Sequence, residues 1–297
     1  MRRPARGLRA ALAAAGVAEF AAAPRPAAAG GGALAFRPAP GRLPPGTRVY
    51  AIGDVHGCAD ALARLLDAIR ADLAARPAAR ATLVLLGDLI DHGPDSAGVI
   101  ALLANGAPVP GAALVALCGD HERMLLDALA GDTAAATDWL AAGGGSSLRS
   151  WGVPADLPRA AWAARLPPAQ LGFLRGLRLS HRAGDYLFLH AGLRPGLPPA
   201  RQRAEDLLSI RHPFLSEPAD FGVVVVHGHS VSPVPEIAAH RIGLDTGAGL
   251  GGMLSCAVLE DDRIACLAVA APLGAPLGAP LGAPLGAPLG APLGEST

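Results

Sequence analysis

The chain contains no lysine, and its arginines are balanced by an equal number of acidic residues. Its 25 basic residues accompany 25 aspartates and glutamates, which leaves no formal net charge at pH 7. Nucleic-acid-binding proteins usually carry a basic stripe or patch, so we expect no nucleic-acid partner. Long apolar runs are also missing, because glycine, proline or a charged residue interrupts each one. We therefore expect no membrane span.

Cysteine is scarce as well, with four residues in the chain (Cys58, Cys118, Cys256 and Cys266). No two of them form a C-x-x-C pair, and three lie in or beside expected strands. This pattern is typical of small buried apolar side chains in a reducing compartment, not of a disulfide or zinc framework. We therefore expect a cytoplasmic protein.

Both ends differ in composition from the middle. Residues 1–46 are rich in Ala, Pro, Arg and Gly without strict periodicity, and we expect a disordered or flexible extension. Their basic start and mildly apolar middle leave a short frayed helix or a cleaved export signal as alternatives. Residues 271–297 contain six copies of APLG. Proline at every fourth position forbids a helix, so we predict a disordered tail and one domain over 47–270.

The first half of this domain alternates strand-like and helix-like segments. Buried strands are predicted at 47–53, 82–87 and 112–119, and helices at 59–76, 94–106 and 121–131. The apolar residues of the first helix recur at helical spacing. Strands that alternate with helices in this way are typical of parallel βαβ units.

The second half of the domain is less regular. Residues 131–180 contain GGGSS, several prolines and all three tryptophans, and predict a helical excursion over the site. Strands resume at 186–190 and 222–228, with a helix-like segment at 200–211. The segments 238–247, 251–260 and 262–270 predict sequential antiparallel strands. The predicted fold class is α/β, with two packed mixed β-sheets flanked by helices.

Aspartate or histidine follows every one of five predicted strands. The five sequences are GDVHG (53–57), GDLIDHG (87–93), GDHE (119–122), HAG (190–192) and HGHS (227–230). For any one of them alone, a turn or a helix N-cap, where aspartate is common, is the favoured explanation. Histidine seldom caps a helix, and ligands gather at the carboxyl ends of strands in open α/β folds. Five such ends in succession therefore predict a site for divalent metals.

The number of candidate ligands exceeds what one tetrahedral ion needs. Three aspartates and three histidines suit two ions about 3.5–4 Å apart that share a bridging carboxylate. Such a pair holds a phosphoryl group and lowers the pKa of a bridging water, which attacks phosphorus in line. The pattern therefore favours phosphoester hydrolysis without a nucleophilic side chain.

Taken together, GDVHG, GDLIDHGPDS, GDHE, HAGLRP and GHS resemble the metallophosphoesterase (calcineurin-like) superfamily, and in particular its bacterial PPP-type serine/threonine phosphoprotein phosphatase branch. The ending RIGLDTGAGLGGMLSC also resembles that branch. The resemblance covers about residues 47–270 and implies an αββα sandwich with two divalent ions. Manganese is the expected metal, with iron and zinc as alternatives. The resemblance also implies a phosphorylated protein or a small phosphoester as substrate. A symmetrical dinucleoside tetraphosphatase and a weakly active phosphate-binding relative remain alternatives.

The resemblance also implies roles for individual residues. The implied metal ligands are Asp54, His56, Asp88, Asp120, His190 and His229, with Asp88 bridging the two ions. A metal-bridging hydroxide would attack phosphorus, and His121, oriented by Asp91, would protonate the leaving oxygen. Arg211 would bind phosphate, and a solvated arginine at a helix end is the alternative. His227 has no role in the pattern, and we expect it to be packed.

Two positions depart from the family pattern. His92 stands where the branch has arginine in D-R-G, and Asp120 where it has asparagine in G-N-H-E. Histidine cannot offer phosphate the bidentate fork of a guanidinium, so we expect weaker substrate binding at position 92. Asp120 can bind a metal at least as well as asparagine, but it adds a negative charge that faces an anionic substrate.

Overall fold

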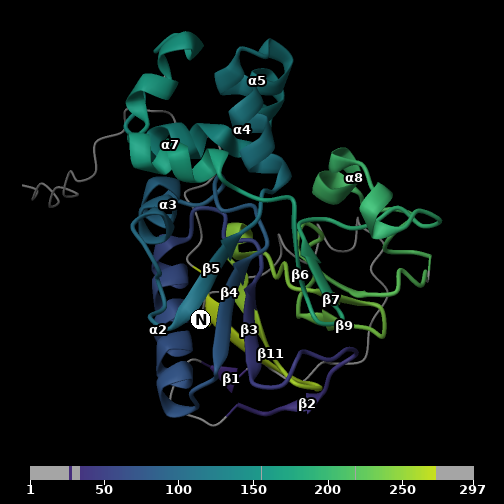
Figure 1. The fold of residues 1–297 in the computed structure, drawn as a ribbon. Coiled ribbons are helices and arrows are strands. Elements are labelled where there is room, and N and C mark those ends of the chain that lie inside the picture. The colour runs from purple at the N-terminus through teal and green to yellow at the C-terminus, as the bar shows by residue number, and fades with distance from the viewer. Residues whose placement is uncertain (1–26, 29–33, 155, 218, 272–297) are drawn as a thin grey trace, which may run out of the picture.

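A computed structural model describes residues 27–28 and 34–271, apart from residues 155 and 218. Two β-sheets pack against each other, and helices cover their outer faces (Figure 1). This arrangement confirms the predicted class of two mixed sheets flanked by helices.

The first sheet contains all three strands predicted in the first half. Its order is β1-β12-β11-β3-β4-β5, with β2 pairing to β12. The strands are β1 (Ala27–Ala28), β2 (Arg37–Pro38), β3 (Thr47–Ile52), β4 (Arg80–Leu85), β5 (Ala112–Ala116), β11 (Met253–Glu260) and β12 (Arg263–Ala270). The helices α2 (Ala59–Ala75) and α3 (Ser96–Ala104) connect β3, β4 and β5, which are parallel, while β11 is antiparallel to both β3 and β12.

The second sheet has the order β6-β7-β8-β10-β9. Its strands are β6 (Ser180–Ala183), β7 (Tyr186–Leu189), β8 (Val224–His227), β9 (Glu236–Ile237) and β10 (Arg241–Gly243). One prediction was wrong here, because β10 does not begin a run of sequential antiparallel strands. It pairs in parallel with β8 and buries Ile242 between the sheets. The chain then crosses to the first sheet, where only β11 and β12 form the expected antiparallel pair.

Apolar side chains fill the space between the sheets and the space under the helices. Val49 and Val84 of the first sheet contribute to the same buried cluster as Phe188 of the second. On the other face of β3, Ile52 packs in a second cluster with Leu62 of α2. Parallel strands covered on both faces read as continuous apolar runs, which explains why β3 is buried at every position.

A helical insertion follows β5 and stands above the ends of β3, β4 and β5 (Figure 1). It comprises α4 (Asp120–Ala130), α5 (Thr133–Trp139), a π-helical turn (Leu140–Gly144), α6 (Gly145–Ser150), two 3-10 turns (Arg159–Ala161 and Ala163–Arg165) and α7 (Pro168–Arg175). Trp139 and Trp162 pack within it, with ring centroids 5.8 Å apart. After β7 of the second sheet, a 3-10 turn (Pro199–Arg201) leads into helix α8 (Ala204–Ser209). A further 3-10 turn (Ala248–Leu250) precedes β11.

The packed part of the chain begins before residue 47, where we placed the start of the domain. Leu43 is buried between the sheets, and β2 pairs with β12. The backbone N–H of Arg42 donates to the Asp185 carboxylate. Proline and glycine around these residues gave the segment the composition of a linker, although its few apolar side chains are in contact with the core. The other predictions for the two ends concern residues outside the described ranges.

The four cysteines are free, and three of them are buried. Burial raises the pKa of the Cys58 thiol to about 11, so this side chain behaves as a small apolar group. Among the described residues, no helix combines the length and the apolar character that a membrane crossing requires.

Candidate metal centre

The five motifs predicted to hold metal meet at one end of the two sheets. Strands β3, β4 and β5 are parallel in the first sheet, and β7 and β8 are parallel in the second. The loops that follow these five strands therefore emerge at a common edge. The structure brings together all six side chains that the resemblance implies as ligands, in two groups that share Asp88.

The first group consists of Asp54, His56 and Asp88, whose candidate ligand atoms lie within 4.8 Å of one another. His56 Nε2 is 3.5 Å from Asp88 Oδ2. Asp54 is 2% exposed, and its Oδ2 accepts a hydrogen bond from the backbone N–H of His229. Its other oxygen, Oδ1, is buried without a hydrogen-bond partner. Buried carboxylate oxygens normally have a partner, and a bound cation fits this position.

The second group consists of Asp88, Asp120, His190 and His229. His190 Nε2 lies 3.4 Å from Asp88 Oδ1 and 3.1 Å from Asp120 Oδ1. His229 Nδ1 lies 3.4 Å from the same oxygen of Asp120. His190 Nδ1 donates to the carbonyl of Leu86, so Nε2 is the nitrogen that faces the carboxylates. Asp88 presents one oxygen to each group, as a bridging ligand does.

The electrostatics of the centre favour a cation. Burial raises the pKa of Asp54, and the nearby Asp245 carboxylate adds to this effect. Burial also opposes ionisation of Asp88, but His190 and His121 hold its pKa at about 2. Burial lowers the pKa of His190, yet Asp88 and Asp120 raise it well above its usual value. Protons on histidine thus balance the carboxylates in the protein alone, and metal ions would displace those protons.

A histidine–carboxylate pair lies beside the two groups. His121 Nδ1 donates to Asp91 Oδ2 over 2.7 Å, and Asp91 is fully buried. Burial lowers the pKa of His121, but the carboxylates of Asp88 and Asp91 outweigh it and raise the pKa to about 9. His121 Nε2 is 4.0 Å from Asp88 Oδ2, so it faces the same centre. A protonated imidazole held in this way can act as a general acid.

Two further side chains, neither of which was predicted to have a role, donate hydrogen bonds to Asp91. The Trp139 indole Nε1–H donates to Asp91 Oδ2 over 2.7 Å, and the Ser147 hydroxyl donates to Oδ1 over 2.5 Å. Both residues come from the helical insertion. The tryptophans and GGGSS were conspicuous in the sequence, but no spacing rule connects them to an aspartate about fifty residues earlier.

Glu122 and Asp245 are also part of the centre, although neither was predicted to have a role. The buried Glu122 carboxylate accepts hydrogen bonds from the backbone N–H groups of Asp88, Leu89, Ile90 and Gly119. It therefore fixes the loop after β4 to the start of α4. Asp245, in the motif GLDTG, is 2% exposed, and burial raises its pKa. Their motifs were visible in the sequence, but their partners were not.

Strained backbone is concentrated at this centre. Six non-glycine residues among those described have positive φ, and five are His56 (45°), Asp88 (48°), Asp91 (72°), His92 (60°) and His229 (61°). The sixth, Asp261, lies in the β11–β12 turn. Non-glycine residues in this region cost free energy and persist where the surrounding structure holds them. The strain therefore falls almost entirely on loops that carry candidate ligands or their neighbours.

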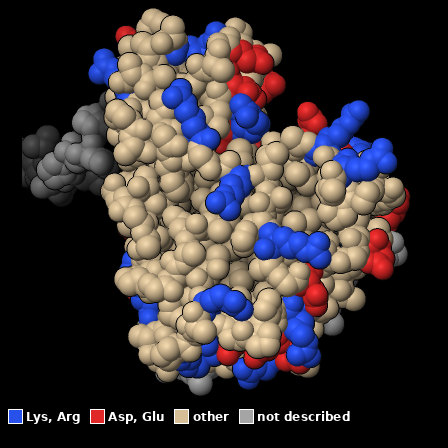
Figure 2. Space-filling view, viewed as in Figure 1, with Lys and Arg blue, Asp and Glu red and all other residues tan. Residues whose placement is uncertain are grey.

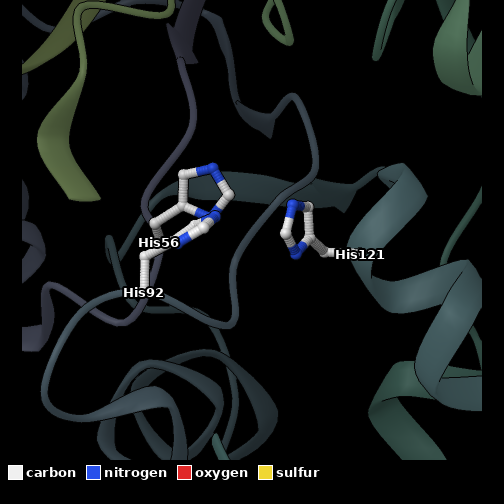
Figure 3. A group of neighbouring side chains, drawn as sticks. All are labelled: His56, His92 and His121. Atoms are coloured by element: carbon white, nitrogen blue, oxygen red, sulfur yellow. The ribbon is translucent and has the colours of Figure 1, made fainter. Parts of the chain in front are cut away.

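Both predicted substrate-binding residues lie beside the candidate ligands. The His92 ring is 4.7 Å from the His56 ring and 5.1 Å from the His121 ring, measured between centroids (Figure 3). The exposed Arg211 donates from Nη2 to the carbonyl of His229 over 3.2 Å. His227 is buried against Phe214, and burial lowers its pKa to about 3. Its burial matches the expectation that this side chain is packed.

Proteins of known sequence related to this chain include two kinds of phosphatase. Serine/threonine-protein phosphatase 1 of Salmonella typhimurium (strain LT2) is 41% identical over 96 residues, which are 32% of this chain and 38% of the relative. The symmetrical bis(5'-nucleosyl)-tetraphosphatase of Dechloromonas aromatica (strain RCB) is 34% identical over 155 residues, 52% of this chain and 47% of the relative. The matched segments thus span less than half the length of either relative.

Solved structures share the fold. A crystal structure described as a proposed diadenosine tetraphosphatase superposes with a TM-score of 0.52 at 26% identity, over 75% of this chain and 93% of that one. A cold-active protein tyrosine phosphatase superposes with a TM-score of 0.53 at 18% identity, over 77% and 81% of the two chains. The second likeness shows the fold alone. The family model of calcineurin-like phosphoesterases matches residues 47–253, more than half of the sequence. The chain therefore belongs to the calcineurin-like phosphoesterase family, as its motifs indicated.

Proposed function

We propose that this metallophosphoesterase hydrolyses phosphomonoesters, and that its substrates are proteins phosphorylated on serine or threonine. The observation that carries the proposal is the buried His121–Asp91 pair beside the ligand groups. A serine or threonine oxygen is a strongly basic leaving group, so it needs a proton as the bond to phosphorus breaks. The imidazolium of His121 is placed to supply that proton.

Asp54, His56 and Asp88 would hold one divalent ion, and Asp88, Asp120, His190 and His229 the other. Carboxylate and imidazole donors fit manganese, iron and zinc, and we propose manganese as the physiological metal. The unpartnered Oδ1 of Asp54 supports a cation at the first position. When bound, such a pair polarises phosphoryl oxygens and makes water nucleophilic at neutral pH.

Arg211 and His92 would contact the phosphoryl group from outside the metal ligands. Arg211 lies at the protein surface against the backbone of His229, where its guanidinium can approach an anion. Burial lowers the pKa of His92 to about 4, with further effects from His56 and His121, so the ring would contact phosphate as a neutral imidazole. Figure 2 shows arginine side chains spread over the middle of one face, where acidic side chains are sparse. Such a face suits an anionic substrate.

A symmetrical dinucleoside tetraphosphatase is the second candidate function. It is favoured by the match to the Dechloromonas aromatica enzyme and by the likeness to the proposed diadenosine tetraphosphatase. A nucleoside diphosphate is a much weaker base than a serine alkoxide, so its departure requires less help from His121. The two candidates therefore differ in how strongly turnover depends on the His121–Asp91 pair.

A substrate panel separates the candidates. The protein is loaded with Mn²⁺ and assayed with phosphoserine and phosphothreonine peptides, p-nitrophenyl phosphate and diadenosine tetraphosphate. Asp88→Ala serves as the inactive control, and Asp138→Ala, which changes an exposed residue of α5, as the matched variant. We expect the highest kcat/KM with the phosphopeptides. Efficient release of ADP without turnover of phosphopeptides would establish the second candidate. Turnover of none of these substrates with Mn²⁺, Fe²⁺ or Zn²⁺ would contradict both.

A further inference from the structure

His56, His92 and His121 form a third group of candidate ligands that contains no carboxylate. One ring nitrogen from each of the three lies within 4.8 Å of the others. The centroids of the His56 and His121 rings are 4.9 Å apart, and His92 completes the triangle. Figure 3 shows the three rings gathered around one space, with His56 and His92 on the loops after β3 and β4 and His121 in the first turn of α4. We call this group the histidine triad.

The hydrogen bonds of two triad members direct their free nitrogens into that space. His56 Nδ1 donates to the carbonyl of Ile90 over 2.9 Å, and His121 Nδ1 donates to Asp91 Oδ2 over 2.7 Å. Each of these hydrogen bonds keeps a proton on Nδ1, so Nε2 is the nitrogen that a metal can bind once it displaces any proton there. Metal-binding histidines are commonly oriented in this way, by a carbonyl or carboxylate on the other nitrogen.

The surrounding backbone makes room for His92 in particular. Its own φ is 60°, in the left-handed region. A Cβ at Gly143 would lie 2.9 Å from His92 Nδ1, and a Cβ at Gly249 would lie 2.6 Å from His56 Cβ and 3.1 Å from His92 Cβ. Side chains at these two glycines would push the rings out of their places. Glycine at these two positions therefore leaves the rings the space that they occupy.

We propose that the histidine triad is a third metal site, which binds a single zinc-like ion through His92 and the Nε2 atoms of His56 and His121. Three neutral imidazoles with water as the fourth ligand form a known kind of zinc coordination. An all-imidazole site selects zinc over manganese, which favours oxygen donors. Zinc–nitrogen bonds of about 2.0–2.1 Å require the three rings to rotate inward. Rotation of His92 is the main movement, since hydrogen bonds hold the other two rings.

A zinc ion bound in the triad would compete with the dinuclear centre for the His56 ligand. The lone pair on His56 Nε2 can serve only one ion, so zinc in the triad removes a ligand from the first metal position. It also engages His121 Nε2 and removes the proposed proton donor. Zinc in excess is therefore expected to inhibit the manganese-loaded protein. This consequence rests on the proposed function, whereas zinc binding by the triad does not.

Cobalt spectroscopy tests the site without any activity measurement. The full chain is stripped of metal and titrated with Co²⁺, because four-coordinate cobalt absorbs visible light far more strongly than five- or six-coordinate cobalt. Zinc affinity is then measured by displacement of the bound Co²⁺. The test variant is His92→Gln, which removes the imidazole from a partly exposed position. His240→Gln, outside every ligand group, is the matched control, and Asp120→Ala disrupts only the dinuclear centre.

We expect the intense absorption in the wild type, in His240→Gln and in Asp120→Ala, and its loss in His92→Gln. Loss of even an indirect metal contact commonly costs 10–100-fold in affinity, so His92→Gln should weaken zinc binding by about 100-fold or more. Unchanged absorption and zinc affinity in His92→Gln would overturn the proposal, and so would loss of the absorption in Asp120→Ala. If the protein bound zinc in this way but hydrolysed no phosphoester, only the proposed function would fail.

Discussion

Two buried polar clusters lie at opposite ends of β3, and they are built on opposite principles. The first, which we call the arginine cluster, consists of Arg48, Tyr50, Asp72, Arg76 and Glu260. Arg48 is 2% exposed, and its Nη2 is 3.0 Å from Glu260 Oε2. Arg76 Nη2 is 2.7 Å from Asp72 Oδ1, and the Tyr50 hydroxyl donates to Asp72 Oδ2. Two arginines and two carboxylates thus neutralise one another.

At the metal centre, at the other end of β3, the carboxylates are balanced in the protein alone by protons on histidine and not by arginines. Its buried carboxylates belong to Asp54, Asp88, Asp91, Glu122 and Asp245. The partners of Asp88 are histidines, which are neutral unless protonated, and one oxygen of Asp54 has no partner. Burying an uncompensated charge is costly. The arginine cluster is complete within the protein, whereas the metal centre is completed by ions from outside it.

The difference separates a structural network from a functional one. Both clusters contain shifted pKa values, so a shift alone does not mark an active site. Burial opposes the charge of Arg48, but Tyr50 and Glu260 raise its pKa and keep it charged. At the metal centre the shifts oppose one another, with the pKa of Asp54 raised and that of Asp88 lowered to about 2. Mutations in the two clusters should therefore affect different properties of the protein.

The largest effect on the metal centre is expected from Asp88→Ala. Asp88 belongs to both ligand groups, so the variant should lose both ions and essentially all turnover, more than about 10⁴-fold. Elemental analysis after loading with Mn²⁺ gives the metal content directly, and circular dichroism checks the fold. Asp138→Ala should keep two ions per chain. Full metal content in Asp88→Ala would rule out the bridging role.

A smaller loss is expected from His121→Asn, which removes the proposed acid and leaves the six ligands in place. General acid catalysis contributes about 10²–10⁴-fold, so kcat for an alkyl phosphate should fall by that factor. p-Nitrophenyl phosphate, with its better leaving group, should lose much less. The acid acts only while protonated, and its pKa in the protein alone is about 9. Bound cations would lower that value. Wild-type kcat should therefore fall as pH rises toward 9, and His121→Asn should lack this alkaline decline.

The corresponding change in the arginine cluster is Asp72→Asn, which should lower stability and spare the chemistry. Removing one partner of a buried ion pair costs about 3–5 kcal/mol, and the solvent access of Asp72 places the loss near the lower end. Urea unfolding measures it, with Asp67→Asn, an exposed change on the same helix, as the control. Metal content and kcat of the folded variant should equal those of the wild type. A marked loss of bound metal would show that the two clusters are coupled.

The smallest effect is expected from Ser147→Ala, which removes one of the donors to Asp91. A buried acceptor that loses its partner costs about 1–3 kcal/mol. Part of this cost should appear as a fall in kcat of about tenfold, because Asp91 orients His121. The alkaline decline of kcat should shift to a different pH, whereas KM and metal content stay constant. Ser216→Ala, on an exposed loop, is the control. An unchanged pH profile would reduce Ser147 to a packing role.

Much of the centre could be predicted because its residues lie directly after apolar strands. Asp54, Asp88 and His190 each follow a run whose burial is evident from composition, and parallel strands end at one edge. Trp139 and Ser147 could not be predicted in the same way. Their contacts with Asp91 depend on how the helical insertion folds back, and a π-helical turn with Gly143 at φ 105° sets that path. Side-chain contacts across such an irregular segment leave no periodic signal.

The sequence by itself determined the order of the strands along the chain, the ligand types at their ends and the family. These properties are local, because a buried strand and the loop that follows it are encoded within about ten residues. Only the tertiary structure decided that β10 joins β8, that Leu43 belongs to the core, and that His92 faces His56 and His121. Each of these depends on contacts between segments far apart in the chain. Such contacts are selected by the free energy of the whole packed core, not by the preferences of any one segment.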